Sequence, residues 1–181
     1  MSERGDYGLW GMRAIFLGLV AVVLFFQLLP LYTAPKGWTG PDLVLAFSLA
    51  WCARRPDHLP PLLLAGTFFL CDLLLQRPPG LWAALMLIAC EYLKGQARIL
   101  RDAGLFTEIF TISLCIIGVG LGYRFILAVL LVDVPPLGLS AIQTFATLAA
   151  YPLAVLVLAA LLGVRRTAPG DLERTSVGGR T

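Results

Sequence analysis

The chain has 181 residues, of which 59% are hydrophobic and only 14% are charged, and its formal net charge is +3 at pH 7. This composition, with a mean hydropathy of +0.84, excludes an ordinary soluble domain, whose surface needs far more charge. The small positive charge does not indicate a nucleic-acid-binding protein. We expect it to lie along the membrane edge, next to anionic lipid head groups.

Six apolar stretches follow one another and indicate six membrane-spanning segments. A span needs about 20 residues to cross a hydrocarbon core of roughly 30 Å, and helices are expected because backbone polar groups in lipid must be satisfied internally. We predict an all-α integral membrane protein: a six-helix bundle over residues 1–164 and a disordered cytoplasmic tail over residues 165–181. The stretches are Met12–Leu31, Pro41–Ala53, Leu59–Leu75, Gly80–Leu93, Leu105–Val132 and Leu137–Val164.

The first two stretches differ in length. Met12–Leu31 is longer than the apolar region of a signal peptide, and the residues after it form a poor cleavage site, so a retained span is predicted. Asp42–Ala53 reaches only about 18 Å at ~1.5 Å per residue, and Pro41 suits its first turn. Either the bilayer thins around this helix, or neighbouring helices shield it from lipid.

The later stretches carry turn and packing signals. The segment Gln76–Gly80, with its Pro-Pro-Gly sequence, predicts a tight outer hairpin. Gly118 and Gly122 form a small-xxx-small face that predicts close helix packing, with a hinge or partner groove as the alternative. The cysteines are predicted to be single packing residues rather than disulfide or metal partners: Cys52, Cys71, Cys90 and Cys115.

The basic residues predict the orientation. With a cytoplasmic N-terminus, Lys36 and Arg77 lie in outside loops and Arg124 lies within a span. Short basic loops resist translocation, so the bias predicts that both termini are cytoplasmic. Eleven of the 14 basic residues then lie inside: Arg4, Arg13, Arg54, Arg55, Lys94, Arg98, Arg101, Arg165, Arg166, Arg174 and Arg180.

Three ionisable residues inside the spans are the first candidates for function, namely Asp72, Glu91 and Arg124. Asp72 and Arg124 lie toward the outer side at similar depth. We predict an ion pair between them, which spares each charge an isolated burial. In the alternative, Asp72 caps the Pro-Pro-Gly hairpin and Arg124 extends to the outer surface. Glu91 is predicted to pair with Lys94 or Arg98 on its own helix face rather than relay protons.

Catalytic constellations are missing from the sequence. His58 is the only histidine and lies in a predicted cytoplasmic loop, so neither a Ser–His dyad nor a histidine metal site can form. Ser140 lacks a base, and an aspartate pair of Asp72 with Asp42 or Asp133 has no family-motif spacing. There is also no phosphate-binding loop. We predict a protein that is not an enzyme and needs no cofactor.

Six residues at fixed spacing resemble the pattern of the rod-shape-determining protein MreD family: Pro41, Trp51, Pro56, Asp72, Gly80 and Arg101. Chain length, the six-span layout and the cytoplasmic termini match as well. The matched block covers about a third of the chain, and the other spans match only in hydropathy. One departure is Phe68, where the family often has a small residue; Gly66 lies two residues earlier.

The resemblance implies a non-enzymatic subunit of the cell-elongation machinery in the bacterial inner membrane. It would act with MreC and be linked to the MreB filament and to RodA and its penicillin-binding transpeptidase, which build lateral peptidoglycan. The implied bundle is similar to the S-components of energy-coupling-factor transporters. Candidate contacts are the outer segments Trp38–Asp42 and Gln76–Gly80 and the inner residues Arg54, Arg55, Arg98 and Arg101.

The alternative function is a vitamin-binding S-component of a transporter. Such a protein would need a central pocket in which polar and aromatic groups converge. The outer-half residues that could supply it are Asp72, Arg124, Gln143, Tyr123 and Trp82.

Overall fold

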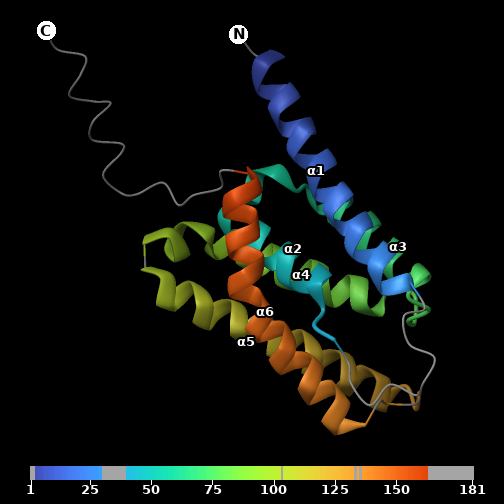
Figure 1. Cartoon of the computed structure of the whole chain (residues 1–181). Coiled ribbons are helices and arrows are strands. Elements are labelled where there is room, and N and C mark those ends of the chain that lie inside the picture. Colours follow the sequence, from blue (N-terminus) through green and yellow to red (C-terminus); the bar gives the residue numbers. More distant parts are fainter. Residues whose placement is uncertain (1–2, 30–39, 103, 133, 135, 163–181) are drawn as a thin grey trace, which may run out of the picture.

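The computed structural model describes residues 3–29, 40–102, 104–132, 134 and 136–162 (Figure 1). These residues form six α-helices and one short 3-10 helix, with no strand among them, which confirms the all-α prediction. The elements are α1 (Glu3–Leu28), α2 (Leu43–Arg54), η1 (Pro56–His58), α3 (Pro61–Leu74), α4 (Leu81–Asp102), α5 (Gly104–Val129) and α6 (Leu137–Leu162).

Three of the helices are long and apolar enough to cross a membrane, over Leu9–Leu28, Phe106–Val129 and Leu137–Ala160. The prediction of six membrane-spanning helices is therefore not supported. Helices α2 and α3 have 12 and 14 residues, about 18 and 21 Å at ~1.5 Å per residue. Helix α4 is long enough, but its second half is charged.

The short helix α2 lies at the centre of the molecule. Every residue from Val44 to Ala53 is buried, and α1, α4, α5 and α6 all pack against this helix. On the α1 side, the Trp51 ring meets the Phe16 ring edge to face, with 5.5 Å between centroids. The helix can be short because its neighbours keep it from lipid, which is the second of the two arrangements that the sequence allowed.

The surface of the molecule is apolar, and several polar groups are inside. Large hydrophobic side chains such as Leu62, Phe106 and Phe125 are exposed, whereas Ser48 and Thr67 are buried. Soluble monomers rarely expose apolar area on this scale. The pattern is that of a membrane protein, in which lipid covers the outer side chains.

Helix α4 differs from the prediction. A span over Gly80–Leu93 followed by a basic turn was expected, but one helix runs from Leu81 to Asp102. Its second half buries Leu93 and Ala97 and exposes Arg98, so it is amphipathic. The chain reverses only at Gly104, whose positive φ of 87° suits a residue without a Cβ atom.

The glycine face predicted on α5 is only half correct. A Cβ atom on Gly122 would lie 3.4 Å from Leu85 Cδ2 of α4, whereas one on Gly118 would meet nothing within 4 Å. The buried residues Ile112, Ile116 and Val119 define the inner stripe of α5, and helical spacing puts Gly118 far from it. Gly118 is therefore not a packing residue among the residues that the structure describes.

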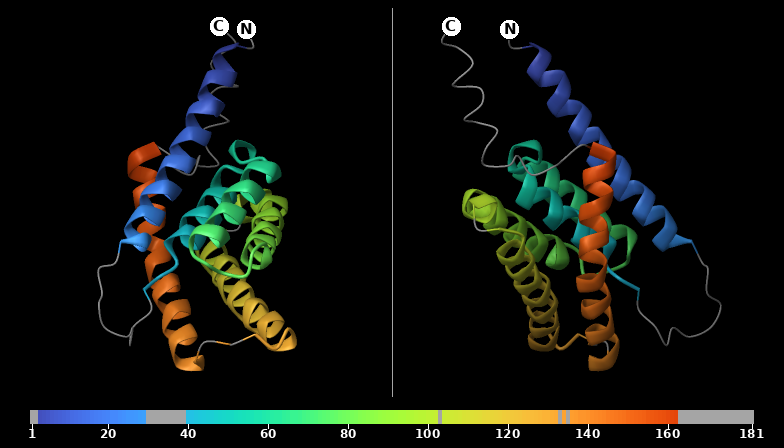
Figure 2. Two further views of the ribbon diagram at one scale, coloured as in Figure 1. Left: turned by 90° about the vertical axis from the view of Figure 1, so that its right-hand side faces the viewer. Right: turned by 60° about the vertical axis from the view of Figure 1, so that its left-hand side comes forward.

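The first turn of α1 and the end of α6 lie on the same side of the molecule, opposite the α5–α6 connection (Figures 1 and 2). Helix α1 contacts α2 and η1, and Arg13 Nε donates a hydrogen bond of 3.3 Å to the His58 carbonyl. The predicted tail over residues 165–181 lies outside the described residues.

Candidate functional site

The α3–α4 hairpin is held by Asp72, which is completely buried. Its Oδ2 accepts hydrogen bonds from the backbone N–H of Gly80 at 2.9 Å and of Ala83 at 3.1 Å. The first N–H groups of a helix have no partner within the helix, so the carboxylate satisfies the start of α4. Gly80 has a φ of 86°, which a residue with a Cβ atom rarely adopts.

The predicted ion pair between Asp72 and Arg124 is wrong. Arg124 Nη1 instead donates to Ser140 Oγ at 2.6 Å, and the ion pairs among the described residues do not include these two side chains. Two amides, eight and eleven residues along the chain, both donate to the same carboxylate oxygen of Asp72, Oδ2, while Oδ1 is buried and has no hydrogen-bond partner among the described residues. The alternative interpretation, in which Asp72 caps the hairpin, is confirmed.

A second buried carboxylate, Asp42, joins the start of α2 to the hairpin. Its Oδ1 accepts from the Leu45 N–H at 3.0 Å, and its Oδ2 lies 3.4 Å from Arg77 Nη2. The Asp42 N–H donates to Thr147 Oγ1 of α6 at 2.9 Å. The Arg77 guanidinium also lies 4.7 Å above the Trp82 ring. The sequence placed Asp42 and Arg77 at the outer edge but did not pair them.

A cavity of about 530 Å³ opens beside this junction, between α5 and α6, and we call it the α5–α6 cavity. Four of the five residues predicted to form an outer polar pocket line it: Arg124, Gln143, Tyr123 and Trp82. The Trp82 and Tyr123 rings meet edge to face at 5.2 Å. Asp72 does not line the cavity, and its carboxylate accepts from the hairpin amides instead. The cavity combines charged, hydroxyl, amide and aromatic groups with an apolar wall.

The other end of α2 carries a buried polar cluster that the sequence analysis missed. Arg54 Nη2 lies 3.0 Å from Glu108 Oε1 of α5, and Tyr151 Oη of α6 donates to the same oxygen at 2.9 Å. The side chains of Arg54 and Glu108 are only 10% and 4% exposed. The prediction that Arg54 is an inner contact for a partner is therefore wrong, since its guanidinium is used inside the chain.

The sequence contained a signal that could have predicted the ion pair of Glu108 with Arg54. It is an acidic residue inside a predicted apolar stretch, close to the same membrane edge as Arg54. A buried carboxylate needs a cation or several donors, and a buried guanidinium needs a carboxylate. Matching the two by depth would have predicted the pair.

The remaining basic predictions have different outcomes. The pairing of Glu91 with Lys94 is confirmed, with 2.6 Å between Oε1 and Nζ. Lys94 Nζ also donates to the Leu59 carbonyl at 2.5 Å, which ties α4 to the turn before α3. Arg55 and Arg98 are exposed and remain candidate inner contacts. The Arg101 side chain lies outside the described part of the chain.

The pattern positions whose side chains the structure describes make structural contacts in this fold. Pro41 precedes the Asp42 cap of α2, Trp51 is buried in the core, and Pro56 is the first residue of η1. The Gly80 N–H donates a hydrogen bond to the Asp72 carboxylate. These contacts build the hairpin and the central helix.

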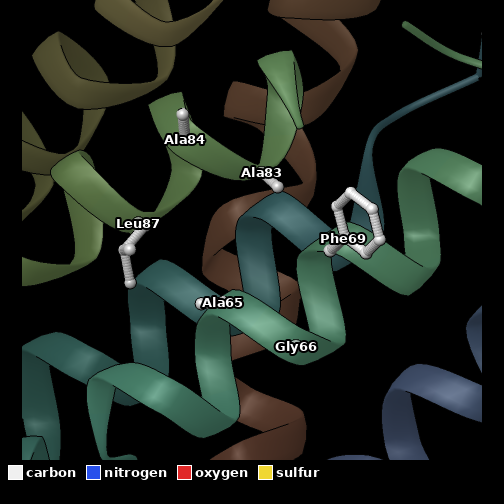
Figure 3. A pocket seen from close by; sticks show the side chains of 6 residues that line it. All are labelled: Ala65, Gly66, Phe69, Ala83, Ala84 and Leu87. Carbon is white, nitrogen blue, oxygen red and sulfur yellow. The ribbon is translucent and has the colours of Figure 1, made fainter. Parts of the chain in front are cut away.

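A second, smaller pocket of about 390 Å³ lies on the outside of the α3–α4 pair (Figure 3). Only apolar or small residues line it: Ala65, Gly66, Phe69, Ala83, Ala84 and Leu87. Phe68, at the position where a small residue was expected, points into the core and is fully buried. No polar side chain is among these lining residues.

Among the residues that the structure describes, no three His, Cys, Asp or Glu side chains converge as a metal site would require. The four cysteines are all free thiols. Comparisons with protein-family models, with curated proteins and with solved structures find no match to this chain.

Proposed function

We propose that this chain is a non-enzymatic scaffold subunit of the bacterial cell-elongation machinery, a member of the MreD family that works with MreC in the inner membrane. It would be linked through that complex to MreB and to RodA with its penicillin-binding transpeptidase. The observation that carries the proposal is the contact of Asp72 with the Gly80 N–H at 2.9 Å. Two positions of the family-like pattern meet there, so the pattern corresponds to a specific fold feature.

The proposal includes six membrane crossings with both termini in the cytoplasm. Three helices are long enough alone. Helices α2, α3 and α4 would cross as an inner group, with the buried α2 shielded by its neighbours and charged ends placed at the head groups. The start of α1 and the end of α6 lie on the same side of the molecule (Figure 1), which supports an even number of membrane crossings.

The surface chemistry supports a binding role. The connections between helices are short where the structure describes them, so partners would meet helix faces and exposed turns. Arg55 follows α2 and Arg98 lies on the exposed face of α4. Both would face the cytoplasm in the proposed orientation, where an acidic partner segment could bind them.

The test uses the bacterium that encodes the chain. Depletion should make rod-shaped cells round, and the wild-type gene should restore them. The double variant Arg55→Gln/Arg98→Gln should restore rod shape poorly. Less MreC should co-purify with this variant than with the wild-type protein. Arg55→Lys/Arg98→Lys is the matched control, because it keeps the charge that orients the helices. Normal cell shape after depletion would refute the proposal.

A second candidate, the vitamin-binding S-component of a transporter, is favoured by the α5–α6 cavity. Its volume of about 530 Å³ and the convergence of Arg124, Gln143, Tyr123 and Trp82 suit a small polar ligand. This candidate predicts that the purified protein carries one equivalent of a water-soluble vitamin, detectable by mass spectrometry after denaturation. Recovery of MreC without such a ligand would leave only the scaffold function.

A further inference from the structure

We propose that the α5–α6 cavity binds the ring of an uncharged, membrane-soluble molecule that accepts hydrogen bonds through carbonyl oxygens, a molecule of the quinone class. The proposal goes beyond the scaffold function, because it assigns a ligand to the chain itself. The cavity volume of about 530 Å³ is within the range of small-molecule sites. The charges, the unpartnered donors and the rim of the cavity carry the argument.

The charged side chains that line the cavity are already engaged within the chain. Arg77 Nη2 lies 3.4 Å from Asp42 Oδ2, and its guanidinium lies 4.7 Å above the Trp82 ring. Arg124 donates to Ser140 Oγ at 2.6 Å and has a further interaction. A charged ligand would therefore lose its hydration without gaining an uncompensated counter-charge from these side chains. The lining favours an uncharged ligand.

Three other polar side chains of the lining have no hydrogen-bond partner within the described part of the chain, namely those of Trp82, Tyr123 and Gln143. They carry an indole N–H, a phenol O–H and an amide NH₂ group, and each is therefore a donor. These groups are accessible, whereas the unpartnered Trp51 Nε1 is enclosed in the core. Lipid hydrocarbon offers no acceptor, so a ligand with acceptor oxygens would satisfy donors that lipid cannot.

The polar groups are spread through the cavity rather than gathered at one end. Trp82 belongs to α4, Tyr123 to α5 and Gln143 to α6. Along α6, polar lining residues run from Ser140 through Gln143 to Thr147, about 10 Å at ~1.5 Å per residue. A ligand with oxygens at one end only would leave part of this set unused. A quinone ring carries carbonyl oxygens on opposite edges, so it can accept from donors on different helices.

The cavity is open toward the bilayer through an apolar rim. Leu121 of α5 and Phe145 of α6 are lining residues and are 63% and 71% exposed. An uncharged ring can enter sideways between these side chains. Its isoprenoid tail would stay among the acyl chains outside, so the cavity itself need not hold a hydrocarbon chain. Membrane quinones combine such a ring with such a tail.

The test is binding of ubiquinone-2 by the full-length protein. The chain is reconstituted in nanodiscs of phosphatidylcholine, ubiquinone-2 is titrated in, and native mass spectrometry counts the bound molecules. We expect one ubiquinone-2 per chain. Geranylbenzene, which has the same tail and a ring without oxygen atoms, is the matched control ligand and should bind at least tenfold more weakly, because it accepts no hydrogen bond from the donors.

Two variants test the donors separately. Tyr123→Phe removes only the hydroxyl group and should weaken ubiquinone-2 binding about fivefold, the effect of one neutral hydrogen bond. Gln143→Leu should have an effect of similar size and covers the case in which Tyr123→Phe does not fold. Tyr92→Phe and Gln96→Leu are the matched controls on α4. Both residues lie outside the cavity lining, so these variants should bind as the wild type does.

Several results would overturn the proposal. These are the absence of bound ubiquinone-2, equal binding of geranylbenzene, or unchanged binding in folded Tyr123→Phe or Gln143→Leu. Recovery of a phospholipid or a water-soluble vitamin from the cavity in place of ubiquinone-2 would overturn it as well. Loss of MreC binding would not affect these measurements, so the scaffold function and the quinone site are tested separately.

Discussion

Two buried carboxylates, Asp72 and Glu108, are stabilised in different ways at two ends of the helix bundle. Asp72 accepts from the Gly80 and Ala83 backbone amides, within eleven residues of itself. Glu108 accepts from Arg54 and Tyr151, which lie on two other helices. The first arrangement is a helix cap that a short segment can form alone. The second forms only when α2, α5 and α6 have assembled.

The difference shows what each region contributes. The hairpin cap fixes the local path from α3 to α4, and it brings no second charged side chain into the interior. The Arg54–Glu108–Tyr151 cluster holds three helices in one register, but it places two charges in a buried site. Removing one partner of such a pair is costly, because the other charge stays buried without compensation.

The largest effect is therefore expected at the cluster. Arg54→Gln should destabilise the protein by about 3–5 kcal/mol, because the buried ion pair between Arg54 and Glu108 would be broken while Glu108 remains buried. The double variant Arg54→Met/Glu108→Leu removes both charges and should recover most of that loss. Denaturant unfolding in detergent, monitored by tryptophan fluorescence, measures the free energy of unfolding of both variants. A double variant as unstable as Arg54→Gln would show that the loss of stability does not come from breaking the Arg54–Glu108 ion pair.

A smaller effect is expected at the hairpin. Asp72→Ala should cost about 2 kcal/mol, because the Gly80 and Ala83 amides would lose their acceptor. Asp72→Asn keeps one side-chain oxygen as an acceptor and should cost clearly less. The same unfolding measurement applies. If Asp72→Asn lowers the free energy of unfolding as much as Asp72→Ala, the negative charge contributes more than the hydrogen bonds of the cap. Asp72 would then resemble Glu108 in depending on its charge.

Helix packing next to the hairpin gives a third comparison. Gly122→Leu should destabilise by about 1–2 kcal/mol, because its side chain would be forced into Leu85, one turn after the capped start of α4. Gly118→Leu is the matched control, since the space around Gly118 is open. Thermal unfolding in detergent compares them. Equal melting temperatures for the two variants would contradict the observed packing of α4 on α5.

The same contrast explains how far the sequence could predict this molecule. The helical class, the tight hairpin and the Glu91–Lys94 pair are local features, and sequence spacing predicted them. The Asp72–Arg124 pair was wrong because two charges at similar depth were matched in preference to the hairpin cap, which was the alternative interpretation. The Arg54–Glu108 contact was missed because it depends on which helices meet. The shortness of α2 was predicted from the sequence, but six spans were predicted where three described helices are long and apolar enough to cross alone. Hydropathy does not show which helices pack against one another.

The smallest expected effect is a pH dependence near the cluster, at His58 of η1. Burial, and then the positive charge of Arg55, lower the pKa of His58 below its usual 6.5. The unfolded chain then binds more protons than the folded one between the folded pKa and about 6.5. Stability should be fully present above pH 6.5 and should fall as the pH drops through that window. His58→Gln should remove this part of the pH dependence in detergent unfolding, whereas Asp72→Asn should leave it in place. If the free energy of unfolding changes with pH equally in His58→Gln and in the wild type, the pH dependence comes from another group.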